Sequence, residues 1–95
     1  MKVTVEFLSL PLITQPLGKK KIEIEFQGST LADLARELGS KIHRAKDVLL
    51  ASDGAIDHDI QIYINGANQV QGEERRSKVL SEGDTVTFMM LVAGG

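Results

Sequence analysis

Four segments of the sequence alternate between apolar and polar residues, namely 2–8, 20–26, 60–64 and 84–91. Because successive side chains of a strand point to opposite faces, each segment is typical of a half-buried β-strand. The apolar positions are Val3, Val5 and Phe7, then Ile22, Ile24 and Phe26, then Ile60, Ile62 and Ile64, and finally Val86, Phe88 and Met90. The pattern predicts a sheet whose inner face carries Val5, Phe7, Ile24, Ile62 and Phe88.

The period changes to that of a helix between the second and third strands. One apolar stripe recurs at i, i+3, i+4 and i+7, formed by Leu31, Leu34, Ala35 and Leu38. Ser29 or Thr30 can cap this helix, with Asp33 at the spacing of a capping box, and Gly39 is a plausible end. A second, weaker helix is predicted over 41–50, with Ile42, Ala45 and Leu49 on one side.

Turn residues separate these elements. Two prolines and a glycine predict a loop over 11–18, whose high apolar content indicates that part of it folds back onto the protein. Asn65-Gly66 is the favoured pair for a type I′ turn, and 68–71 is a short return strand at best. The order of elements predicts an α+β fold in which one or two helices pack on one face of a sheet.

Composition narrows the possible functions. Ninety-five residues favour one domain, and a net charge of −2 argues against a nucleic-acid partner. The sequence has no cysteine, which excludes disulfides and thiolate metal sites and leaves no thiol to carry sulfur. No apolar run approaches the roughly 18 residues of a membrane span. The alternating N-terminal segment does not resemble a signal peptide, so we expect no membrane association and a cytoplasmic location.

Three charged segments are weak candidates for a site. His58 lies between Asp57 and Asp59 and invites a metal interpretation, but a solvated loop is the favoured one, and we expect no bound metal. The lysines at 19–21 are better explained as the solvated start of an edge strand. The mixed charges at 73–76 favour a solvated surface over a partner contact.

The last two residues, Gly94 and Gly95, are the strongest candidate site. At about 7% glycine usage such a pair arises by chance in roughly one sequence in two hundred, and an accidental or artificial end is the alternative. Glycine lets an extended backbone enter a narrow cleft without side-chain clashes. The Gly95 carboxylate would then reach the α-phosphate of a nucleotide and form an acyl-adenylate, which sulfide converts to a thiocarboxylate. We expect a domain over 1–91, a flexible tail over 92–95 and a carboxylate that is free without processing.

Three stretches carry a resemblance to a known family: Ile62-Tyr63-Ile64-Asn65-Gly66, Leu80-Ser81-Glu82-Gly83-Asp84-Thr85-Val86, and Val92-Ala93-Gly94-Gly95. The chain resembles the ubiquitin-like β-grasp sulfur carriers of the molybdopterin-synthase small-subunit and thiamine sulfur-carrier type. The resemblance implies a single β-grasp domain with a mixed sheet. In that fold the first and last strands lie side by side and parallel.

The same resemblance implies a carrier, or cosubstrate, that is not itself an enzyme and binds no cofactor. An E1-like enzyme would adenylate Gly95 with Mg-ATP, a sulfurtransferase would supply sulfur, and a larger synthase subunit would receive the tail. Length and the helical segment near 41–50 favour the molybdopterin pathway, although Met89-Met90-Leu91 stands where that type often has a Phe-Pro-Pro-like stretch. Thiamine, tungsten-cofactor and cysteine carriers are alternatives. So are a protein modifier that forms isopeptide bonds through Gly95 and a plain interaction module.

The last strand also predicts a partner interface. Met89 and Leu91 lie on the face opposite Val86 and Phe88, where they would leave an exposed apolar patch. With Val92 and Ala93 they form the expected interface. The alternative is that the apolar segment 10–17 folds over and covers this patch.

Overall fold

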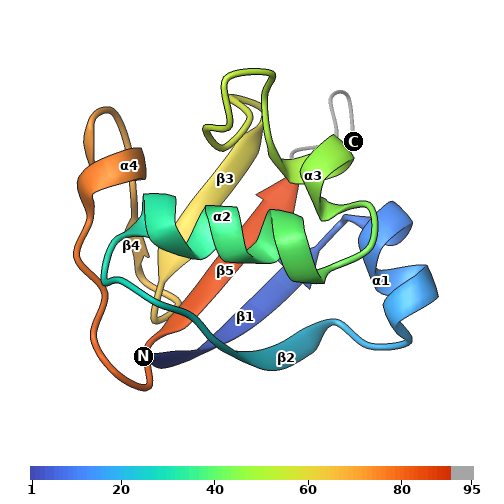
Figure 1. The fold of residues 1–95 in the computed structure, drawn as a ribbon, viewed down its shortest axis with the longest axis horizontal. Coiled ribbons are helices and arrows are strands. Elements are labelled where there is room, and N and C mark those ends of the chain that lie inside the picture. Colours follow the sequence, from blue (N-terminus) through green and yellow to red (C-terminus); the bar gives the residue numbers. More distant parts are fainter. Residues whose placement is uncertain (91–95) are drawn as a thin grey trace.

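A five-stranded mixed sheet forms the centre of the protein (Figure 1). The computed structural model describes residues 1–90. The strands are β1 (Lys2–Leu8), β2 (Lys21–Glu25), β3 (Ile60–Ile64), β4 (Asn68–Gln69) and β5 (Thr85–Met90). The helices are α1 (Pro11–Leu17), α2 (Leu31–Lys41), α3 (Ala45–Leu49) and α4 (Glu74–Ser77).

The strand order is β2-β1-β5-β3-β4, so β5 lies in the middle of the sheet. It pairs in parallel with β1, where Phe7 lies opposite Phe88, and antiparallel with β3, where Ile62 lies opposite Phe88. The parallel pairing of the first and last strands is therefore confirmed. A strand that is hydrogen-bonded on both sides belongs to the most stable part of a domain, so the position of its last residue is well fixed.

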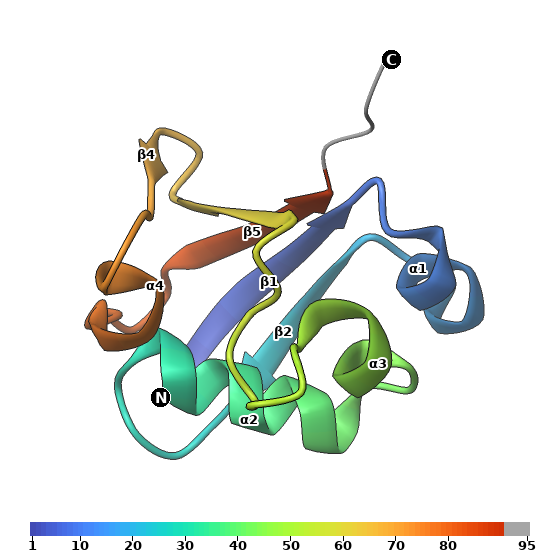
Figure 2. The same ribbon diagram turned by 90° about the horizontal axis from the view of Figure 1, so that it is seen from above.

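The core lies between the sheet and α2, with α2 and α3 on the same side of the sheet (Figure 2). The predicted inner-face residues Val5, Phe7, Ile24, Ile62 and Phe88 are all buried, none of them more than 6% exposed. The rings of Phe7 and Phe88 stack with centroids 6.2 Å apart, within the range of favourable aromatic pairs. The alternation in the sequence therefore predicted the inner face of the sheet correctly.

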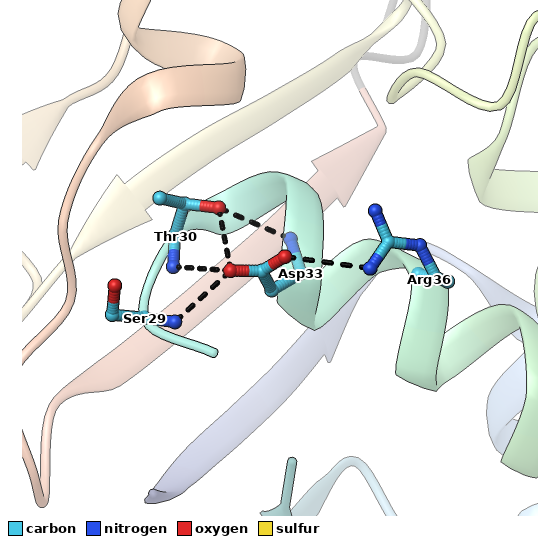
Figure 3. Close-up of polar contacts among 4 residues, drawn as sticks. All are labelled: Ser29, Thr30, Asp33 and Arg36. Carbon is cyan, nitrogen blue, oxygen red and sulfur yellow. Dashed lines mark hydrogen bonds and ion pairs between the residues drawn. The ribbon is translucent and has the colours of Figure 1, made fainter. Parts of the chain in front are cut away.

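A capping box begins α2 as the sequence predicted. The backbone N–H of Asp33 donates to Oγ1 of Thr30 at 3.3 Å, and Asp33 Oδ2 accepts from the backbone N–H of Thr30 at 3.1 Å (Figure 3). Oδ2 also accepts from the N–H of Ser29. The N–H groups of Ser29 and Thr30 and the Thr30 hydroxyl, with a smaller contribution from Arg36, lower the pKa of Asp33 below its ordinary value.

The predicted end of this helix at Gly39 is wrong, because α2 continues to Lys41. An ideal Cβ built on Gly39 would lie only 3.0 Å from Leu50 Cδ1, just after α3. Gly39 therefore permits close packing between α2 and the segment around α3. The second predicted helix is present but shorter than 41–50, and its residues Ala45 and Leu49 are fully buried.

The segment 11–18 was predicted to be a loop, and this prediction is wrong, because Pro11–Leu17 forms α1. Pro11 occupies the start of the helix, where a missing N–H costs nothing, and Gly18 ends it with a φ of 79°. Leu10 and Ile13 are buried, so the predicted packing of this segment against the protein is confirmed. The short helix α4 was not predicted either.

The longest helix in residues 1–90, α2, has 11 residues. No helix in this part of the chain is long and apolar enough to cross a membrane, which takes about 20 residues.

Candidate functional site

The end of β5 is the structural feature closest to the predicted site. Met89 lies opposite Leu8 of β1 and Gln61 of β3, and Met90 lies opposite Ile60. β5 therefore ends at the end of the sheet where β1 also ends and β3 begins. Of the predicted site residues only Met89 is described, because Leu91, Val92, Ala93, Gly94 and Gly95 lie outside residues 1–90.

The start of β5 is fixed by a pair of polar side chains from the two internal stretches of the family resemblance. Asn65 Nδ2 donates to Asp84 Oδ1 at 3.1 Å, and the backbone N–H of Thr85 donates to Asn65 Oδ1 at 2.9 Å. Asp84 Oδ2 also accepts from the N–H of Ser81 at 2.8 Å. Asn65 and Gly66 both have positive φ, as the predicted type I′ turn requires. These contacts set the register of β5 and so the position at which its far end leaves the sheet.

The outer face of the sheet carries a small cavity that reaches Met89, near the end of β5. It has a volume of about 250 Å³ and is lined by Glu6, Leu8, Tyr63, Gly66, Thr87 and Met89. Leu8, Tyr63 and Met89 are half-buried, and together they offer apolar surface. Thr87 is buried although it points outward, and its hydroxyl donates to Glu6 Oε1 at 3.1 Å.

No residue of the segment 10–17 lines this cavity, and Leu10 and Ile13 belong to the core. The alternative in which the segment 10–17 covers the apolar patch therefore finds no support at Met89, and Leu91 lies outside the described residues. Figure 2 shows α2 and α3 on the other side of the sheet from this face. In residues 1–90 the outer face next to the end of β5 is open to a partner.

The histidine and lysine candidates from the sequence lie on the exposed surface of the described part of the chain. His58 is exposed, and Asp57 Oδ1 accepts a turn hydrogen bond from the N–H of Asp59 at 2.9 Å. No group of three acidic or histidine side chains in residues 1–90 is placed to hold a metal. The lysines at 19–21 are exposed at the start of the edge strand β2.

The charge run at 73–76 is more structured than the sequence predicted. It forms most of α4, and Arg75 Nη2 donates to the carbonyl oxygen of Asp57 at 2.8 Å. Burial lowers the pKa of the Arg75 guanidinium, and the charge of Asp57 opposes that shift. No local sequence pattern indicates this contact, because the two residues are 18 positions apart in the chain.

The sequence matches the model of the ThiS family over residues 13–95. No curated protein matches it.

Solved structures share the fold over almost the whole chain. SAMP1 from Haloferax volcanii has a TM-score of 0.76 at 18% identity, with 100% of both chains covered. The small archaeal modifier protein 1 from Methanosarcina acetivorans has a TM-score of 0.77 at 22% identity, covering 99% of this chain and 96% of that one. A chain of the BexX/CysO complex from Amycolatopsis orientalis has a TM-score of 0.72 at 26% identity, covering 98% of this chain and 99% of that one.

Proposed function

The chain belongs to the ThiS family, and on this basis we propose that it is a sulfur carrier whose reacting group is the C-terminal carboxylate of Gly95. The observation that carries the proposal is the family match over residues 13–95, which includes Gly94 and Gly95. The chain acts as a cosubstrate: it binds no cofactor itself, and its partners supply the catalytic groups.

The chemistry has two steps. A carboxylate oxygen of Gly95 attacks the α-phosphorus of ATP and releases pyrophosphate, which forms an acyl-adenylate. A persulfide of the sulfurtransferase then attacks the acyl carbon and displaces AMP, which forms an acyl disulfide. A second thiol of the partner attacks the donor's sulfur in that bond, so that a disulfide forms on the partner and the thiocarboxylate is released on Gly95. An E1-like enzyme holds the Mg-ATP, and a sulfurtransferase supplies the sulfur. Gly94 leaves the backbone narrow enough for both active sites, since glycine adds no side chain.

The place of β5 in the sheet supports this role. Because β5 pairs with β1 as far as Met89 and with β3 as far as Met90, the position at which β5 ends is fixed by both neighbouring strands. A terminal residue usually contributes little to packing. We therefore expect removal of Gly95 to abolish thiocarboxylate formation without changing the unfolding midpoint. We expect Gly94→Val to slow transfer, because a β-branched residue restricts the backbone and widens the tail.

The test is incubation of the protein with its E1-like enzyme, Mg-ATP and a sulfur donor, followed by intact-mass measurement. The wild type should gain the mass difference between one sulfur and one oxygen atom, and the protein that lacks Gly95 should not. Function that survives removal of both Gly94 and Gly95 would contradict the proposal.

The partner surface proposed with this function is the outer face next to Met89, continued by Leu91, Val92 and Ala93. Its support is the open apolar cavity formed with Leu8 and Tyr63. Methionine also suits a surface that must accept more than one partner.

Met89→Asp and Leu91→Asp should each weaken binding of the E1-like enzyme by at least about tenfold, as loss of a central apolar contact does. Val79→Asp is the matched control. Val79 is 64% exposed and comes before the start of β5, whereas the proposed surface lies at the end of that strand. Unchanged affinity of folded Met89→Asp and Leu91→Asp proteins would exclude this surface.

We further propose molybdopterin synthesis as the pathway, with a larger synthase subunit as the acceptor of the tail. The support is the chain length of 95 residues and the helical segment α3 after α2. Deletion of the gene should abolish molybdoenzyme activity while growth without thiamine and without cysteine continues. A thiamine or cysteine requirement with normal molybdoenzymes would contradict this pathway and favour another carrier role.

A protein modifier is the second candidate function, since two of the similar structures are those of small archaeal modifier proteins. Modification uses the same activated Gly95 but joins it to a lysine amine of a target. It therefore predicts conjugates of higher mass that resist reductant. The sulfur-carrier proposal predicts a thiocarboxylate on the unconjugated chain.

A further inference from the structure

A cleft on the helix side of the sheet is separate from the tail and from the outer face. It lies between α2, the segment that follows α3, and α4, and has a volume of about 320 Å³. The residues that matter for its chemistry are Arg36, Arg75 and Arg76 with Asp53, Ala35 and Ile56. We call it the arginine cleft.

The three guanidinium groups come from different elements. Arg36 lies on α2, where its Nη1 is 3.4 Å from Asp33 Oδ1 (Figure 3). Arg76 lies on α4, with its Nη2 3.4 Å from Asp53 Oδ2. Both arginine side chains are largely exposed, and surface pairs of this kind contribute only about 0–1 kcal/mol. A guanidinium has five N–H donors, so each arginine can bind a further carboxylate.

The local charge is opposite to that of the whole chain. Three arginines and one aspartate line the cleft, whereas the chain carries a net charge of −2. Arg75 is the fixed member of the set, because its bond to the carbonyl of Asp57 anchors the side chain between α4 and the segment before β3. After the pairing of Arg36 with Asp33 and of Arg76 with Asp53, the cleft keeps a small positive excess on an acidic protein, which favours an anionic ligand.

The floor of the cleft is apolar, and the cleft continues into a second cavity. Ala35 and Ile56 are 2% and 6% exposed, and both line the cleft. A neighbouring cavity of about 440 Å³ shares Asp53, Ile56, Arg75 and Arg76 with it and adds the acidic residue Glu73. The two together form an elongated surface that suits an extended segment better than a single ion.

We propose that the arginine cleft binds an acidic peptide segment of a partner protein, with one apolar side chain of the segment on the floor and flanking carboxylates on the arginines. Arginine suits this ligand because its planar fork matches carboxylate geometry. The apolar floor gives the inner side chain a place to leave water. This site is independent of Gly95, so its failure and that of the proposed function are separate results.

The test is NMR titration of the full-length ¹⁵N-labelled protein with the acetylated, amidated pentapeptide Glu-Asp-Leu-Glu-Asp. We expect shifts on the segment 50–56, on α4 and on Arg36. The double variant Arg36→Gln with Arg76→Gln should bind at least about tenfold more weakly, because it removes two charge-assisted contacts. Arg44→Gln removes the same type of charge outside the cleft and should bind as the wild type does.

Two further titrations test the nature of the ligand. A peptide with glycine in place of leucine should bind more weakly than the parent, and one with Gln and Asn in place of its acids should not bind. Equal binding of the leucine and glycine peptides would show attraction by charge alone and overturn the proposal. So would shifts caused by inorganic pyrophosphate but not by the acidic peptide, or unchanged binding by the folded double variant.

Discussion

Replacing Asn65 with alanine is expected to destabilise the domain by about 3 kcal/mol, although the residue is exposed. Its side chain makes two hydrogen bonds that join the turn after β3 to the start of β5, one to Asp84 and one from the N–H of Thr85. Its backbone adopts a φ of 53°, which asparagine tolerates far better than alanine does.

The magnitude follows from these two features. Each lost hydrogen bond contributes about 1 kcal/mol, and alanine at positive φ adds about 1 kcal/mol more. A domain of this size has a free energy of unfolding of about 5–15 kcal/mol, so the loss is a substantial fraction. Because 1 kcal/mol corresponds to about 4–8 °C for a domain of up to about 100 residues, Tm should fall by about 12–24 °C.

Urea unfolding of the wild type, Asn65→Ala and Asn68→Ala measures the effect. Asn68 is an exposed asparagine on β4, and its replacement should change stability by no more than about 0.5 kcal/mol. A loss of less than about 1 kcal/mol in Asn65→Ala would show that neither the two hydrogen bonds nor the positive φ contributes to stability as expected.

Two other predictions follow from the core and from the cap of α2. Phe7→Ala should cost roughly 3–5 kcal/mol, since Phe7 is fully buried, whereas Leu12→Ala at a 54% exposed position should have little effect; similar losses in urea would contradict this. Because the pKa of Asp33 is lowered on folding, ionised Asp33 stabilises the folded protein. This contribution is complete at pH values above the ordinary pKa of 3.8 and is lost as the pH falls through the lowered pKa. Asp33→Asn should lack that pH dependence, and matching pH profiles of the two proteins would contradict the assignment.

The strands and the start of α2 could be predicted because their signals are local. Alternation places Val5 and Phe88 on the inner face, and the spacing of Thr30 and Asp33 specifies a capping box that involves only neighbouring residues. The parallel pairing of β1 with β5 joins residues about 80 apart. No periodicity reports such a contact, and it was expected only through the family resemblance.

The errors have the opposite cause, because tertiary packing overrode local preference. Prolines and Gly18 indicated a loop, but burial of Leu10 and Ile13 stabilises α1. Gly39 indicated the end of a helix, but the close approach of Leu50 explains its presence inside α2. The arginine cleft was hidden for the same reason, since it assembles residues from α2, α4 and the segment between α3 and β3.

The most direct test of the sulfur-carrier role is the intact mass of the protein, with its native C-terminus, purified from its own cells under conditions that preserve thiocarboxylates. The sulfur-carrier role predicts a fraction of the chain in which one oxygen is replaced by sulfur, with the mass difference located at Gly95 by fragmentation. That fraction should disappear when the E1-like enzyme is deleted. A chain that carries only an unmodified carboxylate while the pathway is active, or is found only joined through Gly95 to lysines of other proteins, would contradict the account.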